Sequence, residues 1–125
     1  MANDYSASSP IYLQIMNEIK LKIASGEWKT GQRILPVREL AMQFTVNPNT
    51  MQRALSELER EGLIYTERTT GKFVTSDENL VAKVRDTLAR EYLQSFFSSM
   101  QKLGYNMEQT MKTIENYVVE YKEGK

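Results

Sequence analysis

The spacing of the hydrophobic residues changes near Gly62, and this change limits the folds open to the chain. Before Gly62, apolar residues recur three and four positions apart, which is the period of one face of an α-helix. Directly after it, the segment LIYTERTTGKFVT carries β-branched and aromatic residues on both sides of residues 68–71. That composition is typical of two strands joined by a turn. The sequence therefore predicts helices followed by one β-hairpin.

Three helices are expected before the hairpin. The first begins at Pro10 and ends at Gly26. Its apolar stripe consists of Tyr12, Ile15, Ile19 and Ile23. The second follows a short strand at residues 34–35 and extends over residues 36–44. Its buried face is expected to consist of Val37, Leu40, Ala41 and Phe44.

The third helix follows a tight turn. Asn47 is a favourable N-cap and Pro48 a favourable first helical residue, and Gly62 stops the helix. Its inner face is expected to consist of Met51, Ala54, Leu55 and Leu58. Two short helices joined in this way are typical of a helix-turn-helix. A hairpin directly after them makes the motif a winged helix-turn-helix.

The rest of the chain predicts a helical tail. A long helix is expected from Ser76 or Asp77 to Gly104, and another after Asn106, with Gln109 completing a capping box. The apolar faces of these two helices require a cover, and a symmetric partner chain is the economical one. The predicted dimer contacts are Leu88, Tyr92, Phe96, Met100, Met111, Ile114, Val118 and Tyr121.

The expected fold is thus mostly α-helical with a small β wing. It comprises a flexible arm at residues 1–9, a winged helix-turn-helix at 10–76 and a dimerisation tail at 77–125. No apolar run approaches the roughly 20 residues that cross a bilayer. The first ten residues also lack the basic start and apolar stretch of a signal peptide. We therefore expect a soluble, cytoplasmic protein without a membrane partner.

The composition excludes several kinds of chemistry. The 125 residues include no cysteine and no histidine, so the chain has no disulfide, thiol nucleophile or His-dependent triad. We expect no catalytic residue, no metal site and no cofactor. The formal net charge is zero. Bulk charge therefore gives no support to nucleic-acid binding, and a DNA interface has to be argued from particular side chains.

The outer face of the third helix carries side chains suited to base recognition. Asn49, Gln52 and Arg53 point away from the buried stripe, near the end that a recognition helix places in the major groove. Asn and Gln pair with adenine, and Arg with guanine, through two hydrogen bonds. Thr50 and the N–H groups at the start of the helix suit a phosphate.

Two further elements are expected on the same surface. Arg38 lies at the exposed start of the second helix. The wing tip carries Arg68, Thr69, Thr70, Gly71 and Lys72. The third helix alone fits an ordinary solvated face equally well, and Arg38 and the wing alone fit a solvated arginine and a plain hairpin turn better. The combination of the three on one surface favours DNA. The alternative is a winged-helix module that binds another protein through the same surface.

Two other groups of residues have simpler interpretations. Glu57, Glu59 and Glu61 are spaced by two, which puts neighbours on different sides of a helix, so we expect them to be solvated rather than to form an acid/base or metal cluster. The methionines and aromatic residues of the tail could line a ligand pocket. Their helical spacing favours core or dimer packing instead.

Over residues 10–74 the sequence resembles the GntR family of bacterial regulators, through PIYLQI, IASGEWKTGQR, VRELA, VNPNTMQRALSELEREGLI and GKFV. VRELA followed by VNPNT and a short helical tail is most similar to the YtrA-like subfamily. The resemblance implies a homodimeric repressor on a palindromic operator in double-stranded DNA, with a transporter operon as its target. The resemblance identifies no effector ligand. It implies that the DNA contacts of the family correspond to Arg38, Asn47, Pro48, Asn49, Thr50, Gln52 and residues 68–72. Arg53 is predicted as a contact mainly because it lies on the outer face of the third helix.

The chain also departs from the family pattern. The family usually opens its second helix with Leu-Pro-Ser, where this chain has Ile34, Leu35 and Pro36, so a capping hydroxyl is lost. Many relatives place arginine where Pro48 stands, so a guanine contact from that position is lost. The wing tip is less rich in glycine, which limits how deeply it enters a minor groove.

Overall fold

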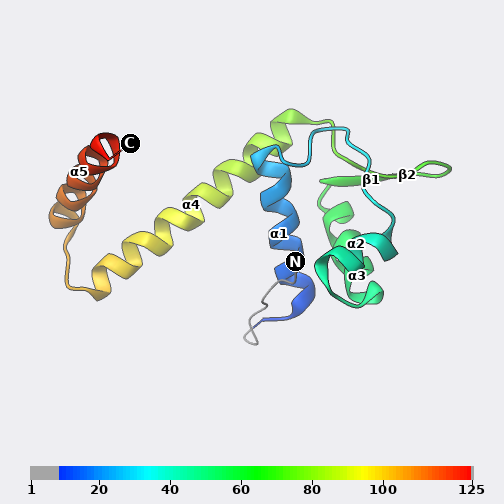
Figure 1. Cartoon of the computed structure of the whole chain (residues 1–125), viewed down its shortest axis with the longest axis horizontal. Helices are drawn as coiled ribbons and strands as arrows, with labels where there is room; N and C mark the ends of the chain where they lie inside the picture. The colour runs from blue at the N-terminus through cyan, green and yellow to red at the C-terminus, as the bar shows by residue number, and fades with distance from the viewer. Residues whose placement is uncertain (1–8, 125) are drawn as a thin grey trace. The chain divides into compact units, whose positions relative to one another are not determined.

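The computed structural model describes residues 9–124, which form two compact units (Figure 1). The first unit extends to Asp86 and the second begins at Thr87. The elements in chain order are α1 (Ile11–Ser25), α2 (Val37–Phe44), α3 (Pro48–Arg60), β1 (Ile64–Glu67), β2 (Gly71–Val74), α4 (Glu78–Lys102) and α5 (Met107–Glu123). The predicted class, mostly helical with a small β wing, is confirmed. The arm expected at the N-terminus lies almost entirely outside the described residues.

The first helix, α1, has the predicted apolar stripe. Ile15, Ile19 and Ile23 are buried, and Tyr12 at the start of the stripe is half-buried. The helix ends at Gly26, which has a φ of 85° and whose N–H donates to the carbonyl oxygen of Ile23. Glycine adopts this left-handed conformation at little cost, which explains why the helix stops there.

The helices α2 and α3 form the predicted helix-turn-helix. The turn between them passes through Thr45, whose φ of 58° is unusual for a β-branched residue. Asn47 then caps α3, because its Oδ1 accepts a hydrogen bond of 2.7 Å from the backbone N–H of Asn49. Pro48 occupies the first helical position. The predicted inner face of α3 is fully buried.

The wing is the predicted hairpin. Ile64 lies opposite Val74 and Glu67 opposite Gly71, with residues 68–70 at the tip. The rings of the cross-strand partners Tyr65 and Phe73 stack with their centroids 5.6 Å apart.

The short strand expected at residues 34–35 is reduced to a single bridge. Arg33 pairs with Phe73, the N–H of Ile34 donates to the carbonyl oxygen of Lys72 at 2.8 Å, and that of Val74 donates to Gln32 at 2.9 Å. The next hydrogen bond along such a ladder would need an N–H from Pro36, which proline lacks. The segment therefore touches the wing at one point and then enters α2.

The core of the first unit also includes the start of α4. Val81 is buried in the same cluster as Ile34, Leu63 and Val74. The side chain of Arg85 donates through Nε to the carbonyl oxygen of Ala24 at 2.8 Å. These contacts explain why the compact unit extends to Asp86, whereas the sequence pattern predicts a boundary at Ser76.

The second unit contains the remainder of α4, a turn at Gly104 and α5. The capping box of α5 is confirmed: Asn106 Oδ1 accepts from the N–H of Gln109 at 2.8 Å, and Gln109 Oε1 accepts from that of Asn106 at 2.9 Å. Many apolar side chains of this unit are exposed. They include Tyr92, Leu93, Phe96, Leu103, Met107, Met111, Tyr117, Val118, Val119 and Tyr121.

No helix within residues 9–124 combines the length and hydropathy that crossing a bilayer requires.

Candidate nucleic-acid interface

The outer face of α3 presents the predicted polar side chains. Asn49, Gln52 and Arg53 are exposed, while the opposite face of the helix is buried. The amide of Gln52 is held in place, because Nε2 donates a hydrogen bond of 3.1 Å to Oγ of Ser56 one turn further along. This bond uses one of the two amide protons and leaves the second proton and Oε1 for a base edge.

Arg53 makes a contact within the protein that the helix phase does not predict. Its guanidinium lies over the ring of Tyr12 on α1, 3.8 Å from the ring centroid. The two side chains line a shallow groove of about 410 Å³ whose walls also include Asn49 and Thr50 at the start of α3. Arg53 is therefore positioned by α1 at the edge of the candidate interface.

Lys72, predicted as a DNA contact of the wing, is engaged with α3. Its Nζ donates to Oγ1 of Thr66 at 3.0 Å and to Oε1 of Glu59 at 3.4 Å. The hydroxyl of Thr66 in turn donates to Oε2 of Glu59 at 2.5 Å. The hydrogen bond from Thr66 is the main cause that lowers the pKa of Glu59 below its ordinary value, and the charge of Lys72 adds to it against the opposing effect of burial.

This cluster of Glu59, Thr66 and Lys72 joins the wing to the C-terminal half of α3. The spacing of the three glutamates predicted a solvated Glu59. Its partners on the wing, Thr66 and Lys72, are 7 and 13 positions away in the chain, and no periodic pattern connects them to Glu59. The other two glutamates go elsewhere: Glu57 pairs with Arg60, and Glu61 with Lys20. The three carboxylates therefore have three different sets of partners.

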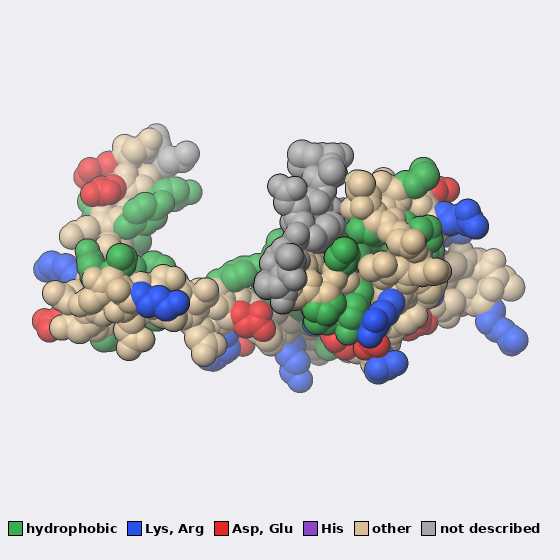
Figure 2. Space-filling view, turned by 90° about the horizontal axis from the view of Figure 1, so that it is seen from below, with side chains coloured by type: hydrophobic (Ala, Val, Ile, Leu, Met, Phe, Trp, Pro, Cys, Tyr) green, Lys and Arg blue, Asp and Glu red, His purple; other side chains and the backbone are tan. Residues whose placement is uncertain are grey.

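The remaining basic residues separate into paired and unpaired groups. Lys20, Lys22, Arg60 and Lys72 each form an ion pair with a carboxylate. Arg33, Arg38 and Arg68 form no ion pair with any residue in 9–124. Figure 2 shows Lys and Arg side chains scattered among acidic ones rather than gathered in one continuous patch. The neutral total thus hides unpaired positive charge at the wing and at the start of α2.

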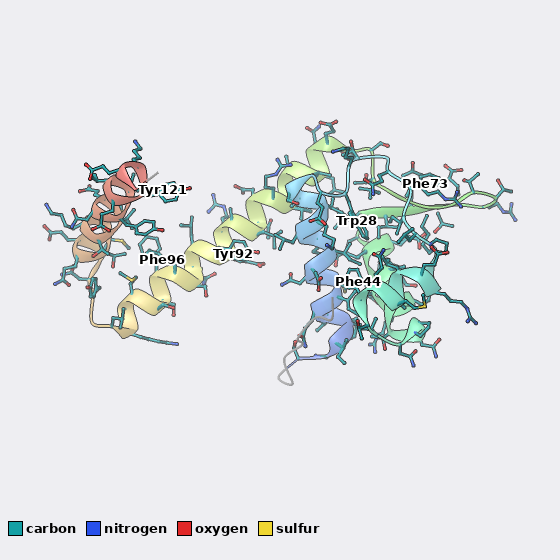
Figure 3. All side chains as sticks on the ribbon, viewed as in Figure 1. Trp28, Phe44, Phe73, Tyr92, Phe96 and Tyr121 are labelled. Carbon is teal, nitrogen blue, oxygen red and sulfur yellow. The ribbon has the colours of Figure 1, made fainter. Side chains whose placement is uncertain are left out.

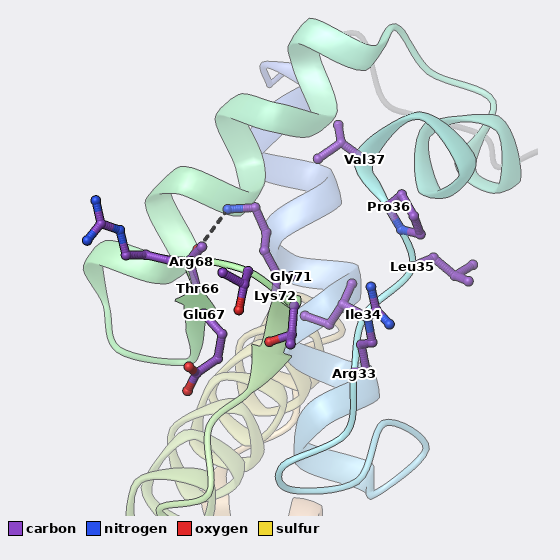
Figure 4. Close-up of a pocket in the computed structure, with 12 residues that line it drawn as sticks. Arg33, Ile34, Leu35, Pro36, Val37, Thr66, Glu67, Arg68, Gly71 and Lys72 are labelled. Atoms are coloured by element: carbon purple, nitrogen blue, oxygen red, sulfur yellow. Dashed lines mark hydrogen bonds between the residues drawn. The ribbon is translucent and has the colours of Figure 1, made fainter.

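A groove lies between the wing and the segment that leads into α2 (Figure 4). It measures about 420 Å³, and its walls are residues 33–37 on one side and 66–72 on the other. Figure 4 shows the side chain of Lys72 turned towards Thr66, and Arg68 projecting outwards at the tip. Arg38 follows directly after this groove, exposed at the second position of α2. Thr69 and Thr70 are exposed at the tip, and Gly71 is half-buried at the start of β2.

The predicted dimer contacts differ in exposure. Leu88 is buried, with 7% of its surface exposed, and Met100 and Ile114 are half-buried. The other five, Tyr92, Phe96, Met111, Val118 and Tyr121, are exposed. Figure 3 shows Tyr92 and Phe96 on α4 and Tyr121 on α5.

Comparisons with known proteins agree with this geometry. Residues 11–74 match the family model described as bacterial regulatory proteins, gntR family. The chain is 38% identical over 117 residues to the uncharacterized HTH-type transcriptional regulator YhcF of Bacillus subtilis, covering 94% of this chain and 97% of that one. It is 32% identical over 123 residues to the HTH-type transcriptional repressor YtrA of the same organism, covering 98% and 95%.

Solved structures give the same result. A GntR family transcriptional regulator from Listeria monocytogenes superposes with a TM-score of 0.80 and 39% identity, covering 90% of this chain and 98% of that one. AraR(DBD) in complex with operator ORX1 superposes with a TM-score of 0.54 and 30% identity, covering 60% and 95%. The resemblance to the YtrA-like regulators is confirmed, as is the prediction that the chain is not an enzyme. The chain belongs to the GntR family of bacterial transcriptional regulators.

Proposed function

We propose that this regulator is a homodimeric repressor that binds a palindromic operator in double-stranded DNA. The observation that carries the proposal is the exposed polar face of α3, which has α2 packed on one side and the wing on the other. Unpaired arginines lie on both of these neighbours, Arg38 on α2 and Arg68 on the wing. Amides on α3 suit base edges, and the flanking charges suit phosphates. Such a protein acts where the chromosome lies, in the cytoplasm.

The proposed contacts divide by chemistry. Gln52 and Asn49 recognise bases in the major groove, with Arg53 beside them. Residues at the start of α3 and α2 hold the backbone, and the wing tip enters the neighbouring minor groove. The backbone and wing contacts are Asn47, Pro48, Thr50, Arg38, Arg68, Thr69, Thr70 and Gly71. Lys72 acts there through the cluster with Glu59 and Thr66, which joins the wing to α3.

The tail supports the dimer. Phe96 on α4 and Val118 on α5 are 39% and 42% exposed, and they belong to a large set of exposed apolar side chains on these two helices. Grouped exposed apolar side chains mark interaction surfaces. A second copy that covers these faces would bury them symmetrically. The dimer would then hold two α3 helices about 34 Å apart, one turn of DNA, which matches a palindromic operator. Repression follows if the operator overlaps a promoter, and the relative YtrA is described as a repressor.

Selection of bound fragments from the source genome, followed by affinity measurements on the recovered duplex, tests the proposal. We expect affinity to fall steeply as salt is added, because phosphate contacts release counterions. A protein that ignores every duplex at low salt would instead support the protein-binding alternative.

Two variants locate the surface. Arg38→Ala and Gln52→Ala should both weaken operator binding while the sedimentation behaviour stays that of the wild type. Arg60→Ala is the matched control, because Arg60 ends α3 at the opposite end from the proposed base contacts and is 75% exposed. Unchanged affinity in Arg38→Ala and Gln52→Ala would refute the proposed surface.

A further inference from the structure

Arg33 is held in place through its backbone and takes no part in the functional surface described above. Its backbone is fixed to the wing by the bridge to Phe73 and by the hydrogen bonds of its two neighbours. Alternation along an extended segment puts Ile34 into the core, where it is 4% exposed, and leaves Arg33 facing outwards.

The guanidinium of Arg33 lies against Gly71 at the start of β2. A Cβ placed on Gly71 would approach Nε of Arg33 to 3.3 Å and Nη2 to 3.4 Å. Gly71 also has a φ of 123°, a backbone conformation that disfavours an L side chain there. The glycine therefore leaves room for the guanidinium. Both residues line the groove between residues 33–37 and 66–72, which Figure 4 shows.

Arg33 is a basic residue of this groove that combines a fixed backbone with an uncompensated charge. Lys72 is neutralised by Glu59, and Arg68 projects from the tip. Arg33 forms no ion pair with any residue in 9–124. A guanidinium on a fixed segment and without a carboxylate partner is a suitable donor for a phosphate, which it can bind through two parallel hydrogen bonds.

The position of the groove indicates which phosphate of bound DNA Arg33 would contact. When α3 occupies a major groove and the wing the adjacent minor groove, one phosphodiester strand separates the two grooves. That strand passes over whatever lies between the wing and the helix-turn-helix, which here is the segment from Arg33 to Val37. We infer that Arg33 is an additional DNA contact that binds a phosphate of this separating strand. The inference rests on the proposed DNA-binding function.

The experiment compares charge-neutral and charge-retaining variants of the full chain on the selected operator. Arg33→Met keeps the packing against Gly71 but loses the charge, Arg33→Gln keeps polar donors, and Arg33→Lys keeps the charge. We expect Arg33→Met and Arg33→Gln to bind about tenfold or more weakly, with a salt slope reduced by about 0.9 per half-site. Arg33→Lys should keep the wild-type slope, and Arg60→Met should behave as wild type. Thermal unfolding establishes that each variant is folded.

A second measurement assigns the phosphate. Single methylphosphonate substitutions along each half-site remove one charge at a time. At one position, on the strand between the two grooves, the substitution should weaken the wild type but leave Arg33→Met and Arg33→Gln unaffected. If those variants keep the wild-type salt slope and the wild-type response to every methylphosphonate, Arg33 only supports the wing and the inference is wrong. If the wild type itself binds no duplex while folded, the proposed function fails with it.

Discussion

The guanidinium of Arg53 on α3 lies 3.8 Å from the centroid of the Tyr12 ring on α1. This contact joins the candidate recognition helix to the first helix at the edge of the surface that would face DNA. It gives Arg53 a structural role in addition to the base contact that the helix phase predicts.

Replacement of Tyr12 by leucine removes the cation–π contact while keeping an apolar side chain. We expect the free energy of unfolding to fall by about 0.5–1 kcal/mol, the range for partly exposed cation–π pairs. Urea denaturation of Tyr12→Leu, Arg53→Met and the double variant measures the coupling. Strictly additive losses in the two single variants would mean that the contact contributes nothing.

The cluster of Glu59, Thr66 and Lys72 makes stability depend on pH. The pKa of Glu59 in the folded protein is lowered from its ordinary value of 4.5, so ionised Glu59 stabilises the fold above that pH. The contribution disappears as the pH falls through the lowered, folded-state pKa. Glu59→Gln should therefore be less stable than the wild type at neutral pH, and the difference should shrink in acid.

Chemical denaturation at a series of pH values checks this, with Glu57→Gln as the control for a surface carboxylate on the same helix. Thr66→Val should reduce the pH-dependent part, because the Thr66 hydroxyl is the main cause of the lowered pKa. A wild-type advantage that is constant from neutral pH into acid would contradict the assignment.

The hydrogen bond from Gln52 to Ser56 gives a graded test of base recognition. Gln52→Ala should cost about 1–3 kcal/mol of operator binding, as loss of a bidentate base contact does. Ser56→Ala should cost less, because the amide survives but is no longer held in place. Titrations with the selected operator and with a version mutated at the recognised base pair distinguish the two effects. Ser99→Ala, on the exposed part of α4, is the control. Equal losses on both duplexes would show that Gln52 does not recognise that base pair.

The exposed apolar residues of the tail should control oligomeric state. A charge placed in a buried dimer contact is costly, so Phe96→Asp and Val118→Asp should each shift the protein from dimer to monomer. Gln94→Asp is the control, because Gln94 is an exposed polar residue two positions from Phe96 and thus on another side of α4. Sedimentation velocity measures the outcome, and dimers that persist in both apolar variants would exclude this interface.

A chain truncated after Asp86 should be monomeric, folded and much weaker in operator binding. The cut follows Asp86 rather than Ser76 because Val81 belongs to the winged-helix core and Arg85 bonds to Ala24. A truncated chain that still sediments as a dimer would contradict the proposed role of the tail.

The sequence by itself determined the local structure of this protein. Local features depend on residues within one or two helical turns of each other, so they can be recognised in the sequence. Examples are the apolar spacing around Ile19 and Leu55, the N-caps Asn47 and Asn106, and the helix end at Gly26. The hairpin and the outward direction of Gln52 follow from the same local rules. The family resemblance also came from the ordered sequence of these short segments.

Tertiary structure alone decided which charges remain available to a ligand. Lys72 is compensated by Glu59, Arg53 stacks on Tyr12, and Arg33 faces outwards beside Gly71. Each of these contacts joins residues from different elements, and the sequence specifies neither the distance nor the direction between them. Composition sums the charges of a neutral chain, whereas a DNA interface depends on which charges are left unpaired and where the fold places them.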